Sequence, residues 1–545
     1  MKRWNGWGEE STQTALSSES LALLSGLTGK PHEGQAVLAK EEALKRAGEK
    51  VFSGWEGVDS SAEARLSHAR GQSFADWLAF RQGHGLQFPE GVVYPKDEGE
   101  IQRHLEGARR AGARIVVYGG GTSVVGHINR PAGEKPVVIM DMQRMGRLLS
   151  VDRTSQMARF EAGVRGPDIE AQLAPHGMIM GHFPQSYEYA TLGGWVATRS
   201  SGQQSLYYGR IEDLFAGGRL ITAEGEMELP PLPASSAGVD LRQVWMGSEG
   251  LMGVISEATV RVRALPDVES FHGVFFPRWE QAEEFAREVV QSRVPVSMLR
   301  LSSGKETFVT LALAGKPTQI RWLERYLSWR GVREEKCLVI VGLTGKSVQV
   351  KQTRAMVGRL ASAQGGVWIG QSLGRAWKKN RFHGPYLRNT LWDHGWGVDT
   401  LETAMPYAQV RAGVAKIEAA LEEAAAAFGE KILVYTHLSH FYITGCAIYT
   451  TYLFRLQRTP EETFAMWKAM KSKASEAILS LRGTISHQHG VGKDHAAYLG
   501  AEKSAMGMQW MRSMVEKADP EGLFANGNLF PAGEPILQSA FEQQG

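Results

Sequence analysis

The sequence predicts a multidomain α+β protein, and three observations lead to this fold class. The chain has 545 residues, which is too long for one ordinary domain. Short apolar runs typical of strands alternate with longer amphipathic runs typical of helices. Glycine is concentrated, with 28 of the 62 glycines lying between positions 71 and 265. Because glycine permits tight turns and close approach of the backbone to a ligand, we expect ligand chemistry in that block.

The N-terminal part of the chain predicts helices followed by a parallel α/β unit. Residues 11–70 are rich in Ala, Glu, Lys and Leu, with helical spacing between Ala36 and Ala47, so residues 1–70 are expected to form a helical N-terminal segment. Strands are expected at 92–95, 114–118 and 136–140, and an amphipathic helix at 98–111 separates the first two. Strand–helix–strand order is typical of a parallel sheet.

Two further regions complete the expected organisation. Short strands and glycine turns alternate up to residue 265, which ends the block 71–265. Residues 266–482 predict a second α+β domain, and residues 483–545 predict a tail of Gly-, His- and Asn-rich loops that packs back on the first domain. In the second domain we expect strands at 274–276, 308–313, 337–342, 432–436 and 447–453, and helices at 279–290, 348–363, 405–428 and 460–481.

Composition and charge exclude several classes of protein. Lys and Arg total 61 against 58 Asp and Glu, so a nucleic-acid partner is not expected. Two cysteines, an N-terminus without an apolar signal segment, and the lack of a long uncharged apolar run predict a cytoplasmic protein. Basic residues at 375–381 and 468–473 are compatible with peripheral contact to an anionic membrane, although a solvated face is the preferred explanation.

The first chemical motif is Gly119–Ser123 (GGGTS), directly after an expected strand. Consecutive glycines expose backbone N–H groups that can surround an anion, and Thr122 and Ser123 add hydroxyl donors. The loop is therefore a candidate pyrophosphate site. It lacks the GxGxxG spacing of a Rossmann dinucleotide fold, and a flexible turn would explain the same residues.

Three further segments carry candidate site residues. A Gly-Gly pair follows residues 182–191 (HFPQSYEYAT), and residues 247–255 (GSEGLMGVI) form a glycine turn that enters a strand. His487 and His489 flank one residue, so on a strand both imidazoles face the same side. They suit acid–base chemistry near neutral pH, or metal binding if a third ligand such as His437 or His440 joins them. Structural histidines are the alternative.

In combination, these motifs resemble the vanillyl-alcohol-oxidase superfamily of FAD-binding proteins and, within it, the alkyldihydroxyacetonephosphate synthase family. The resemblance covers roughly residues 75–265 and 365–530. It rests on five segments in this order: VYGGGTS at 117–123, PQSYEYATLGGWVATRSSG at 184–202, YGRIEDL at 208–214, GSEGLMGVI at 247–255 and GTISHQHGVGKDH at 483–495.

The resemblance implies a two-subdomain, PCMH-type FAD-binding domain at 71–265, an α+β cap domain of the FAD-linked oxidase C-terminal type at 266–482, and a helical N-terminal segment. It also implies FAD at the domain interface. The first loop lacks the histidine of covalent members, so non-covalent FAD is expected, although His127 lies nearby. The implied cofactor-binding residues are Val117, Tyr118, Gly119, Gly120, Gly121, Thr122, Ser123, Gln185, Ser186, Tyr187, Glu188, Tyr189, Ala190, Thr191, Thr198, Arg199, Ser200, Ser201, Glu249, Gly250, Leu251, Met252, Gly253, Val254 and Ile255.

The family's reaction replaces the acyl group of acyl-dihydroxyacetone phosphate by a fatty alcohol, a step of ether-lipid synthesis without net redox change. The resemblance assigns acid–base catalysis to Tyr449, with His487 and His489, and phosphate binding to Arg388. Gln488 departs from the family pattern, which has a third histidine at that place.

A different function fits the same cofactor. An FAD-dependent dehydrogenase or oxidase of a 2-hydroxy acid or a glycerol phosphate is the alternative. Related 2-hydroxy-acid dehydrogenases carry an acidic and asparagine-containing metal segment, whereas residues 437–440 read His-Leu-Ser-His, so no metal is expected. A non-enzymatic flavoprotein is a third reading. A small-molecule or lipid-phosphate substrate and a homodimer are the expected partners.

Overall fold

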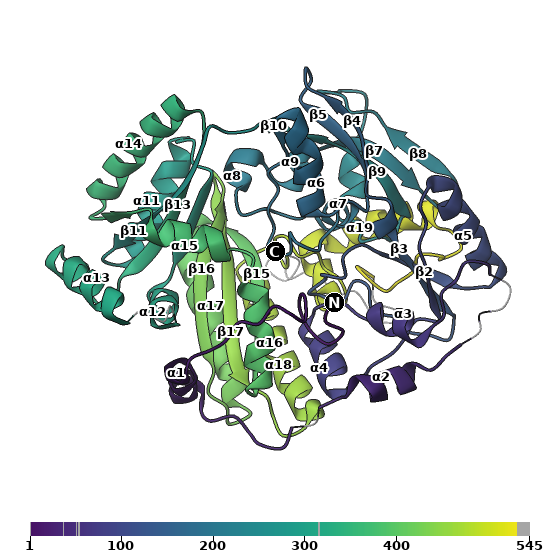
Figure 1. The fold of residues 1–545 in the computed structure, drawn as a ribbon, viewed down its shortest axis with the longest axis horizontal. Coiled ribbons are helices and arrows are strands. Elements are labelled where there is room, and N and C mark those ends of the chain that lie inside the picture. The colour runs from purple at the N-terminus through teal and green to yellow at the C-terminus, as the bar shows by residue number, and fades with distance from the viewer. Residues whose placement is uncertain (1, 36, 51, 53–54, 314–316, 531–545) are drawn as a thin grey trace.

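The computed structural model describes residues 2–35, 37–50, 52, 55–313 and 317–530. Part of the expected tail, residues 531–545, lies outside this range, as does Ala36. Figure 1 shows a glycine-rich first domain on one side of the molecule and a large mixed domain on the other, with the C-terminal helix α19 (Ala496–Ala518) running back into the first.

The first domain begins with a three-stranded parallel sheet. Its order is β1 (Gly91–Val93), β3 (Val137–Asp141) and β2 (Arg114–Tyr118), and helix α5 (Glu98–Arg110) makes the crossover. The α5 helix begins where the side chain of Asp97 accepts a hydrogen bond from the amide of Glu100. Its apolar face is buried, as the helical spacing predicts. The GGGTS loop begins directly after Tyr118, at the carboxyl end of β2.

A five-stranded antiparallel sheet forms the second part of this domain. Its order is β4 (Leu148–Asp152), β5 (Met157–Glu161), β9 (Val254–Arg261), β7 (Phe215–Ile221) and β8 (Glu226–Leu229). Short helices connect these strands. They are α6 (Gly166–Leu173), α7 (Leu192–Thr198), α8 (Ser205–Tyr208), α9 (Ile211–Leu214) and α10 (Arg242–Trp245), with 3₁₀ turns at Met142–Arg144 and Ala174–His176 and the strand pair β6 (Met178–Ile179) and β10 (Arg263–Ala264).

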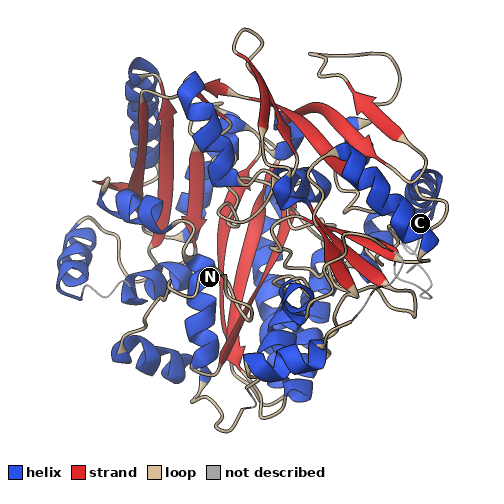
Figure 2. Ribbon diagram, turned by 45° about the vertical axis from the view of Figure 1, so that its right-hand side comes forward, coloured by secondary structure: helices blue, strands red, loops and turns tan. Residues whose placement is uncertain are grey.

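The second domain is built on a seven-stranded antiparallel sheet, whose long strands stand out in Figure 2. Alternate residues of each strand enter different cores: Val339 packs on one face and Leu338 on the other. The strand order is β14 (Val367–Gly370), β11 (Val268–Phe276), β13 (Cys337–Gly345), β12 (Met298–Ser302), β16 (Leu433–Phe441), β17 (Gly445–Arg455) and β15 (Trp396–Pro406).

Helices cover both faces of this sheet. One core joins the strands to α11 (Trp279–Gln291), α14 (Ser347–Ala363), α17 (Tyr407–Ala426) and α18 (Pro460–Ser480). On the opposite face, another core joins them to α12 (Gly304–Leu313), α13 (Pro317–Trp329) and α15 (Ser372–Asn380). Helix α16 (Gly384–Asp393) packs against β15. No helix of the described residues is long and apolar enough to cross a membrane.

The N-terminal segment packs on both domains. Helix α1 (Ser18–Thr28) buries Leu24 against Trp396 and Leu453 of the second domain. The remaining helices lie against the first strands or continue toward the second domain: α2 (Lys40–Ala47), α3 (Ala62–Ser67) and α4 (Phe74–Gln82).

Three expected elements differ from the structure. Residues 308–313, expected as a strand, belong to α12, because a short apolar run does not distinguish a strand from a half-buried helix. The expected helix at 405–428 starts only at Tyr407, since β15 runs to Pro406 in register with β17. The tail contains α19 rather than loops alone, and its following turn joins the first sheet where the amide of Ile115 donates to the carbonyl of Leu523 (2.8 Å).

Candidate active site

The loop Gly119–Ser123 leaves its backbone amides unused. Among the described residues, none of these five N–H groups donates a hydrogen bond to another group of the chain. A Cβ on Gly120 would collide with the carbonyl oxygen of Tyr189, and a Cβ on Gly119 would collide with Oγ1 of Thr191. The glycines therefore let two predicted cofactor loops touch while their amides stay available. This arrangement fits a pyrophosphate.

Glu249 connects this loop to the C-terminal tail. Its carboxylate accepts hydrogen bonds from the amides of Val491 (2.5 Å) and Gly492 (2.9 Å). Nε2 of His127 lies 3.2 Å from the same carboxylate, and Nδ1 of His127 lies 2.8 Å from Oγ of Ser123. Three of the sequence motifs thus meet through these contacts.

Other predicted cofactor residues direct their side chains away from the GGGTS loop. Arg199 donates to a backbone carbonyl (3.1 Å), and Gln185 donates to the carbonyl of Arg381 (2.7 Å). Glu188 accepts from the hydroxyl of Tyr386 (3.2 Å). These hydrogen bonds connect loops and domains, and cofactor contacts of these residues stay predictions. The side chains of Leu251, Met252, Val254 and Ile255 are buried in apolar cores.

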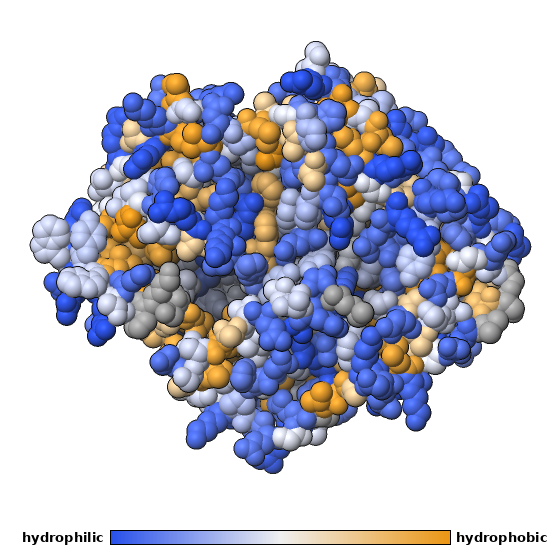
Figure 3. Space-filling view, in the orientation of Figure 1, coloured by the Kyte–Doolittle hydropathy of each residue, from blue (hydrophilic) through white to orange (hydrophobic). Residues whose placement is uncertain are grey.

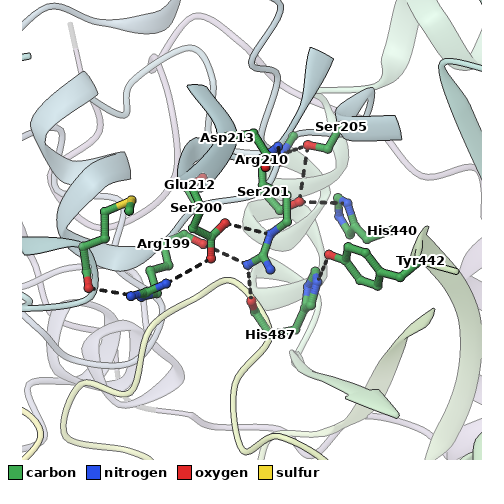
Figure 4. Close-up of polar contacts among 12 residues, drawn as sticks. Arg199, Ser200, Ser201, Ser205, Arg210, Glu212, Asp213, His440, Tyr442 and His487 are labelled. Carbon is green, nitrogen blue, oxygen red and sulfur yellow. Dashed lines mark hydrogen bonds and ion pairs between the residues drawn. The ribbon is translucent and has the colours of Figure 1, made fainter. Parts of the chain in front are cut away.

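A hydrogen-bonded relay ends on His487. Its Nδ1 lies 3.0 Å from Oε1 of Glu402, and its Nε2 lies 2.6 Å from the hydroxyl of Tyr442 (Figure 4). Because an ionised carboxylate only accepts, a neutral His487 carries its proton on Nδ1 and accepts from Tyr442 at Nε2. Gln488 donates to Oε2 of Glu402 (2.5 Å), and Nε2 of His489 lies 3.7 Å from that oxygen.

Glu402 is the charged centre of the site. Its side chain is fully buried on β15. Burial by itself would raise the pKa of Glu402, but the hydrogen bond from His487 and the nearby imidazoles outweigh it and lower the pKa. Burial lowers the pKa of His440 to about 3, so that imidazole is neutral. At position 488 the family pattern has a histidine, which can carry a proton. Gln488 cannot, and its amide instead donates a hydrogen bond to Glu402.

The two domains meet at this relay. Arg210 of the first domain donates to the carbonyl of His487 (3.0 Å), and its guanidinium lies over the ring of Tyr442 at 5.9 Å. Oγ of Ser201 lies 3.0 Å from Nδ1 of His440. Figure 4 shows Arg210 between the first-domain residues and the His487–Tyr442 pair. Docking of the domains is thus coupled to the position of the predicted catalytic histidine.

Tyr449 lies beside this relay on β17. The strand register places Tyr449 opposite both Glu402 and His437. Its ring stacks on His437 with centroids 4.7 Å apart, and the ring of His489 lies 6.2 Å away. Burial raises the pKa of Tyr449 to about 12. The phenol is therefore protonated at neutral pH and can donate a proton.

Arg388 presents an incompletely paired cation. Its Nη1 donates to the carbonyl of Gln72 (2.6 Å), while the buried Nε and Nη2 have no hydrogen-bond partner. The guanidinium lies over the ring of Trp77 at 4.5 Å. Burial lowers the pKa of Arg388, and Tyr449 is near enough to oppose this shift electrostatically. Unsatisfied buried N–H groups are costly, so an anionic ligand would find a prepared site here.

Two additional charged clusters surround the site. Arg300 donates to Glu306 (2.7 Å), and Nδ1 of His437 lies 3.1 Å from the same carboxylate oxygen, which fixes the ring that stacks on Tyr449. Lys471 is buried and donates to Oδ2 of Asp399 (3.3 Å). These pairs hold the surroundings of Tyr449 and Arg388 in one arrangement.

A metal ion is geometrically conceivable at the relay. Glu402, His440 and His487 each offer one ligand atom, and these atoms lie within 4.8 Å of one another. His437, the other proposed ligand, is instead bound to Glu306. Hydrogen bonds already account for the short contacts of Glu402 and His487, as described above.

Sequence reasoning missed several residues that the fold brings here. Glu402 and Tyr442 carried no local motif, and their roles arise from contacts across strands and to the tail. Arg210 lay within a quoted segment without a role. Lys2 donates to the carbonyl of Gly120 (3.0 Å), so the N-terminal segment reaches the glycine loop. Only a three-dimensional contact reveals these four residues.

Comparison with known proteins defines the class. Residues 89–229 match the family model "FAD binding domain", and residues 265–529 match "FAD linked oxidases, C-terminal domain". The first match contains the loop Gly119–Ser123, and its unused backbone amides are donors that suit the pyrophosphate of FAD. The chain is a flavoprotein with this pair of domains, and the expected fold class and FAD cofactor are confirmed.

Full-length relatives identify the family. Alkyldihydroxyacetonephosphate synthase of Dictyostelium discoideum is 31 % identical over 477 residues, which are 86 % of this chain and 77 % of that protein. The synthase of Trypanosoma brucei brucei is 29 % identical over 570 residues, 97 % of this chain and 92 % of that protein. A solved alkyldihydroxyacetonephosphate synthase superposes with a TM-score of 0.79 at 26 % identity, covering 96 % of this chain and 98 % of that one. The chain belongs to the alkyldihydroxyacetonephosphate synthase family, which confirms the resemblance.

Dehydrogenases are more distant relatives. The mitochondrial D-lactate dehydrogenase [cytochrome] of Arabidopsis thaliana is 24 % identical over 453 residues, 82 % of this chain and 74 % of that protein. The relatives named here are enzymes, and this chain is an FAD-dependent enzyme. The residue roles and the domain boundaries at 70, 265 and 482 stay predictions.

Proposed function

We propose that the enzyme forms alkyl-dihydroxyacetone phosphate by replacing the acyl group of acyl-dihydroxyacetone phosphate with a fatty alcohol. The observation that carries this proposal is Arg388, whose buried Nε and Nη2 await an acceptor near Tyr449. A phosphate supplies several acceptor oxygens for a guanidinium fork. The phosphate group of the substrate would thus be held close to a phenol that can donate a proton.

The side chains divide the remaining tasks. Bound FAD supplies the reactive ring system. Tyr449, protonated at neutral pH, exchanges a proton with the substrate at its hydroxyl. His437 holds the Tyr449 ring by stacking, and Glu402 fixes the tautomer of His487 so that Tyr442 donates to Nε2. His489 lies between Tyr449 and Glu402 and is the second candidate for proton transfer.

The test compares substrates under anaerobic conditions. We expect palmitoyl-dihydroxyacetone phosphate and hexadecanol to yield the ether product and palmitate. The alternative is an FAD-dependent oxidation of a 2-hydroxy acid or glycerol phosphate. If D-lactate or glycerol 3-phosphate bleaches the flavin and the exchange reaction is absent, the alternative replaces the proposal.

FAD is held without a covalent bond in this proposal. One ring nitrogen of His127, the histidine nearest the glycine loop, is hydrogen-bonded to Ser123, and the other faces the Glu249 carboxylate at 3.2 Å without a hydrogen bond. Acid precipitation should therefore release FAD into the supernatant. Flavin that stays with the precipitated protein would contradict this point.

A cytoplasmic location, a homodimer and peripheral membrane contact belong to the same proposal. The two cysteines, Cys337 and Cys446, are both free and buried, which suits a reducing compartment. The two expected basic patches are weak membrane candidates. Lys378 pairs with Glu269 and Lys471 is buried, so part of their charge is used within the protein.

A further inference from the structure

Helix α13 carries an aromatic stripe whose ring contacts, within the described part of the chain, lie inside the helix itself or with Arg330 directly after it. Trp322 is 66 % exposed, Tyr326 is 40 % exposed and Trp329 is 80 % exposed. An α-helix turns by about 100° per residue, so these three positions share one face. Large aromatic side chains seldom stay this exposed in a row, and such patches mark interaction sites.

The opposite face of α13 explains why the stripe points outward. Leu327 is fully buried and Leu323 and Ile320 pack beside it in the core that contains Leu338 and Ile340. The helix is therefore fixed to the sheet by one apolar face while the aromatic face projects into solvent. Figure 3 shows pale and orange side chains at the edge of the molecule that α13 occupies in Figure 1.

Cationic residues border the stripe. The guanidinium of Arg325 lies 5.5 Å from the ring of Trp322, and that of Arg330 lies 5.9 Å from Tyr326. Arg321 and Arg333 are also exposed. The acidic residue within the helix, Glu324, falls on another side and pairs with Lys336 (3.3 Å). Glu334 and Glu335 follow only after the helix has ended.

We infer that α13 docks the enzyme on an anionic lipid surface, with its aromatic stripe at the headgroup level and its arginines on the lipid phosphates. Trp and Tyr prefer the membrane–water interface because one end of each ring system is apolar and the other is polar. A basic amphipathic helix that lies in the interface plane binds through this combination of apolar area and charge. The inference uses the surface alone and does not depend on the proposed substrate.

The test is co-sedimentation of the full-length, FAD-loaded enzyme with large unilamellar vesicles. We expect binding to phosphatidylcholine vesicles that contain about 30 % phosphatidylglycerol, and weaker binding to pure phosphatidylcholine or at high salt. The double substitution Trp322→Ala with Trp329→Ala should lower the partition coefficient by roughly tenfold or more. Flavin content and melting temperature report that the variant is folded.

Two controls separate this surface from others. Trp510 on α19 is 69 % exposed, so Trp510→Ala removes an equally exposed indole and should leave vesicle binding unchanged. Lys378→Gln with Lys379→Gln tests the basic patch of α15 and should also have little effect. Charge is tested by Arg325→Gln with Arg330→Gln, which should weaken binding mainly to anionic vesicles.

Several results would overturn the inference. These are wild-type enzyme that does not bind anionic vesicles, a tryptophan double variant that binds as the wild type does, and a Trp510→Ala effect of equal size. If the double substitution instead converts a dimer into a monomer without changing vesicle binding, the stripe is a protein interface. Alkyl transfer from dispersed substrates is measured separately, so a failure here leaves the proposed function standing.

Discussion

Replacing Arg388 by methionine should remove the phosphate site while leaving the fold intact. Methionine keeps an unbranched apolar stem but lacks the guanidinium, and with it the ring contact to Trp77 and the two buried donor nitrogens that have no partner. A hydrogen bond to a charged group contributes roughly 1.5–3 kcal/mol, so losing two costs about 3–6 kcal/mol of transition-state binding. We expect kcat/KM to fall by about 10²- to 10⁴-fold.

Stability should respond differently from activity. The substitution gives up one hydrogen bond to Gln72, but it also removes a buried cation with unsatisfied donors. The melting temperature should therefore change by no more than about 3 °C. Arg388→Lys keeps the charge without the fork and should recover only part of the activity.

The assay is steady-state formation of the ether product, with the flavin spectrum as a check of folding. Arg375→Met, on the exposed side of α15, serves as the matched control and should keep wild-type kcat/KM. If Arg388→Met keeps kcat/KM within about threefold of the wild type, Arg388 does not hold the substrate phosphate. A spectrum without bound flavin would make the loss of activity uninformative, in which case Arg388→Lys decides.

The remaining predictions concern the relay, the cofactor loop and pH. Tyr449→Phe should lower kcat by about 10²-fold or more with an unchanged flavin spectrum, and retained activity would refute its proton-transfer role. Glu402→Gln should lower kcat by about 10²-fold and displace the pH profile, because His487 loses the carboxylate that fixes its tautomer; a profile identical to the wild type would argue against the relay. Gly120→Ala should prevent FAD binding, measured by the ratio of flavin to protein absorbance, whereas Gly358→Ala, where a Cβ meets nothing within 4 Å, should bind FAD normally. Burial raises the pKa of Asp494 to about 7, so folding stability falls as the pH rises toward 7; Asp494→Asn should therefore stabilise the protein by on the order of 2 kcal/mol more at about pH 8 than at about pH 5 in urea unfolding, and an equal effect at both would contradict the shift.

Local signals in the sequence were sufficient for the cofactor side of the molecule. The GGGTS loop directly follows an expected strand, and consecutive glycines at such a place indicate close approach of the backbone to a ligand. Gly119 and Gly120 could therefore be singled out from the sequence. The strands expected at 114–118 and 136–140 also followed from their own apolar runs, and the structure has them at Arg114–Tyr118 and Val137–Asp141. A short apolar run that is buried on one side is compatible with a strand or with a helix. Residues 308–313 are such a run, and the structure shows them as part of helix α12.

Contacts between distant segments were beyond the sequence. Glu402 meets His487 only because β15 is the edge strand next to β17 and the tail runs along its free edge, where the amide of His487 donates to the carbonyl of Glu402 (3.2 Å). Tyr442 joins them from the turn between β16 and β17. No periodicity or motif encodes such a register, which depends on the order of strands within the whole sheet. The aromatic stripe of α13 was likewise hidden, because exposure is a property of the fold.

The most direct test of the central claim follows labelled hexadecanol in the absence of oxygen and of any electron acceptor. We expect the purified holoenzyme to convert palmitoyl-dihydroxyacetone phosphate into labelled alkyl-dihydroxyacetone phosphate over many turnovers, with palmitate released in equal amount and no lasting bleaching of the flavin. A reaction that stops after about one turnover with reduced flavin, or that requires an electron acceptor, would show net oxidation and would contradict the account.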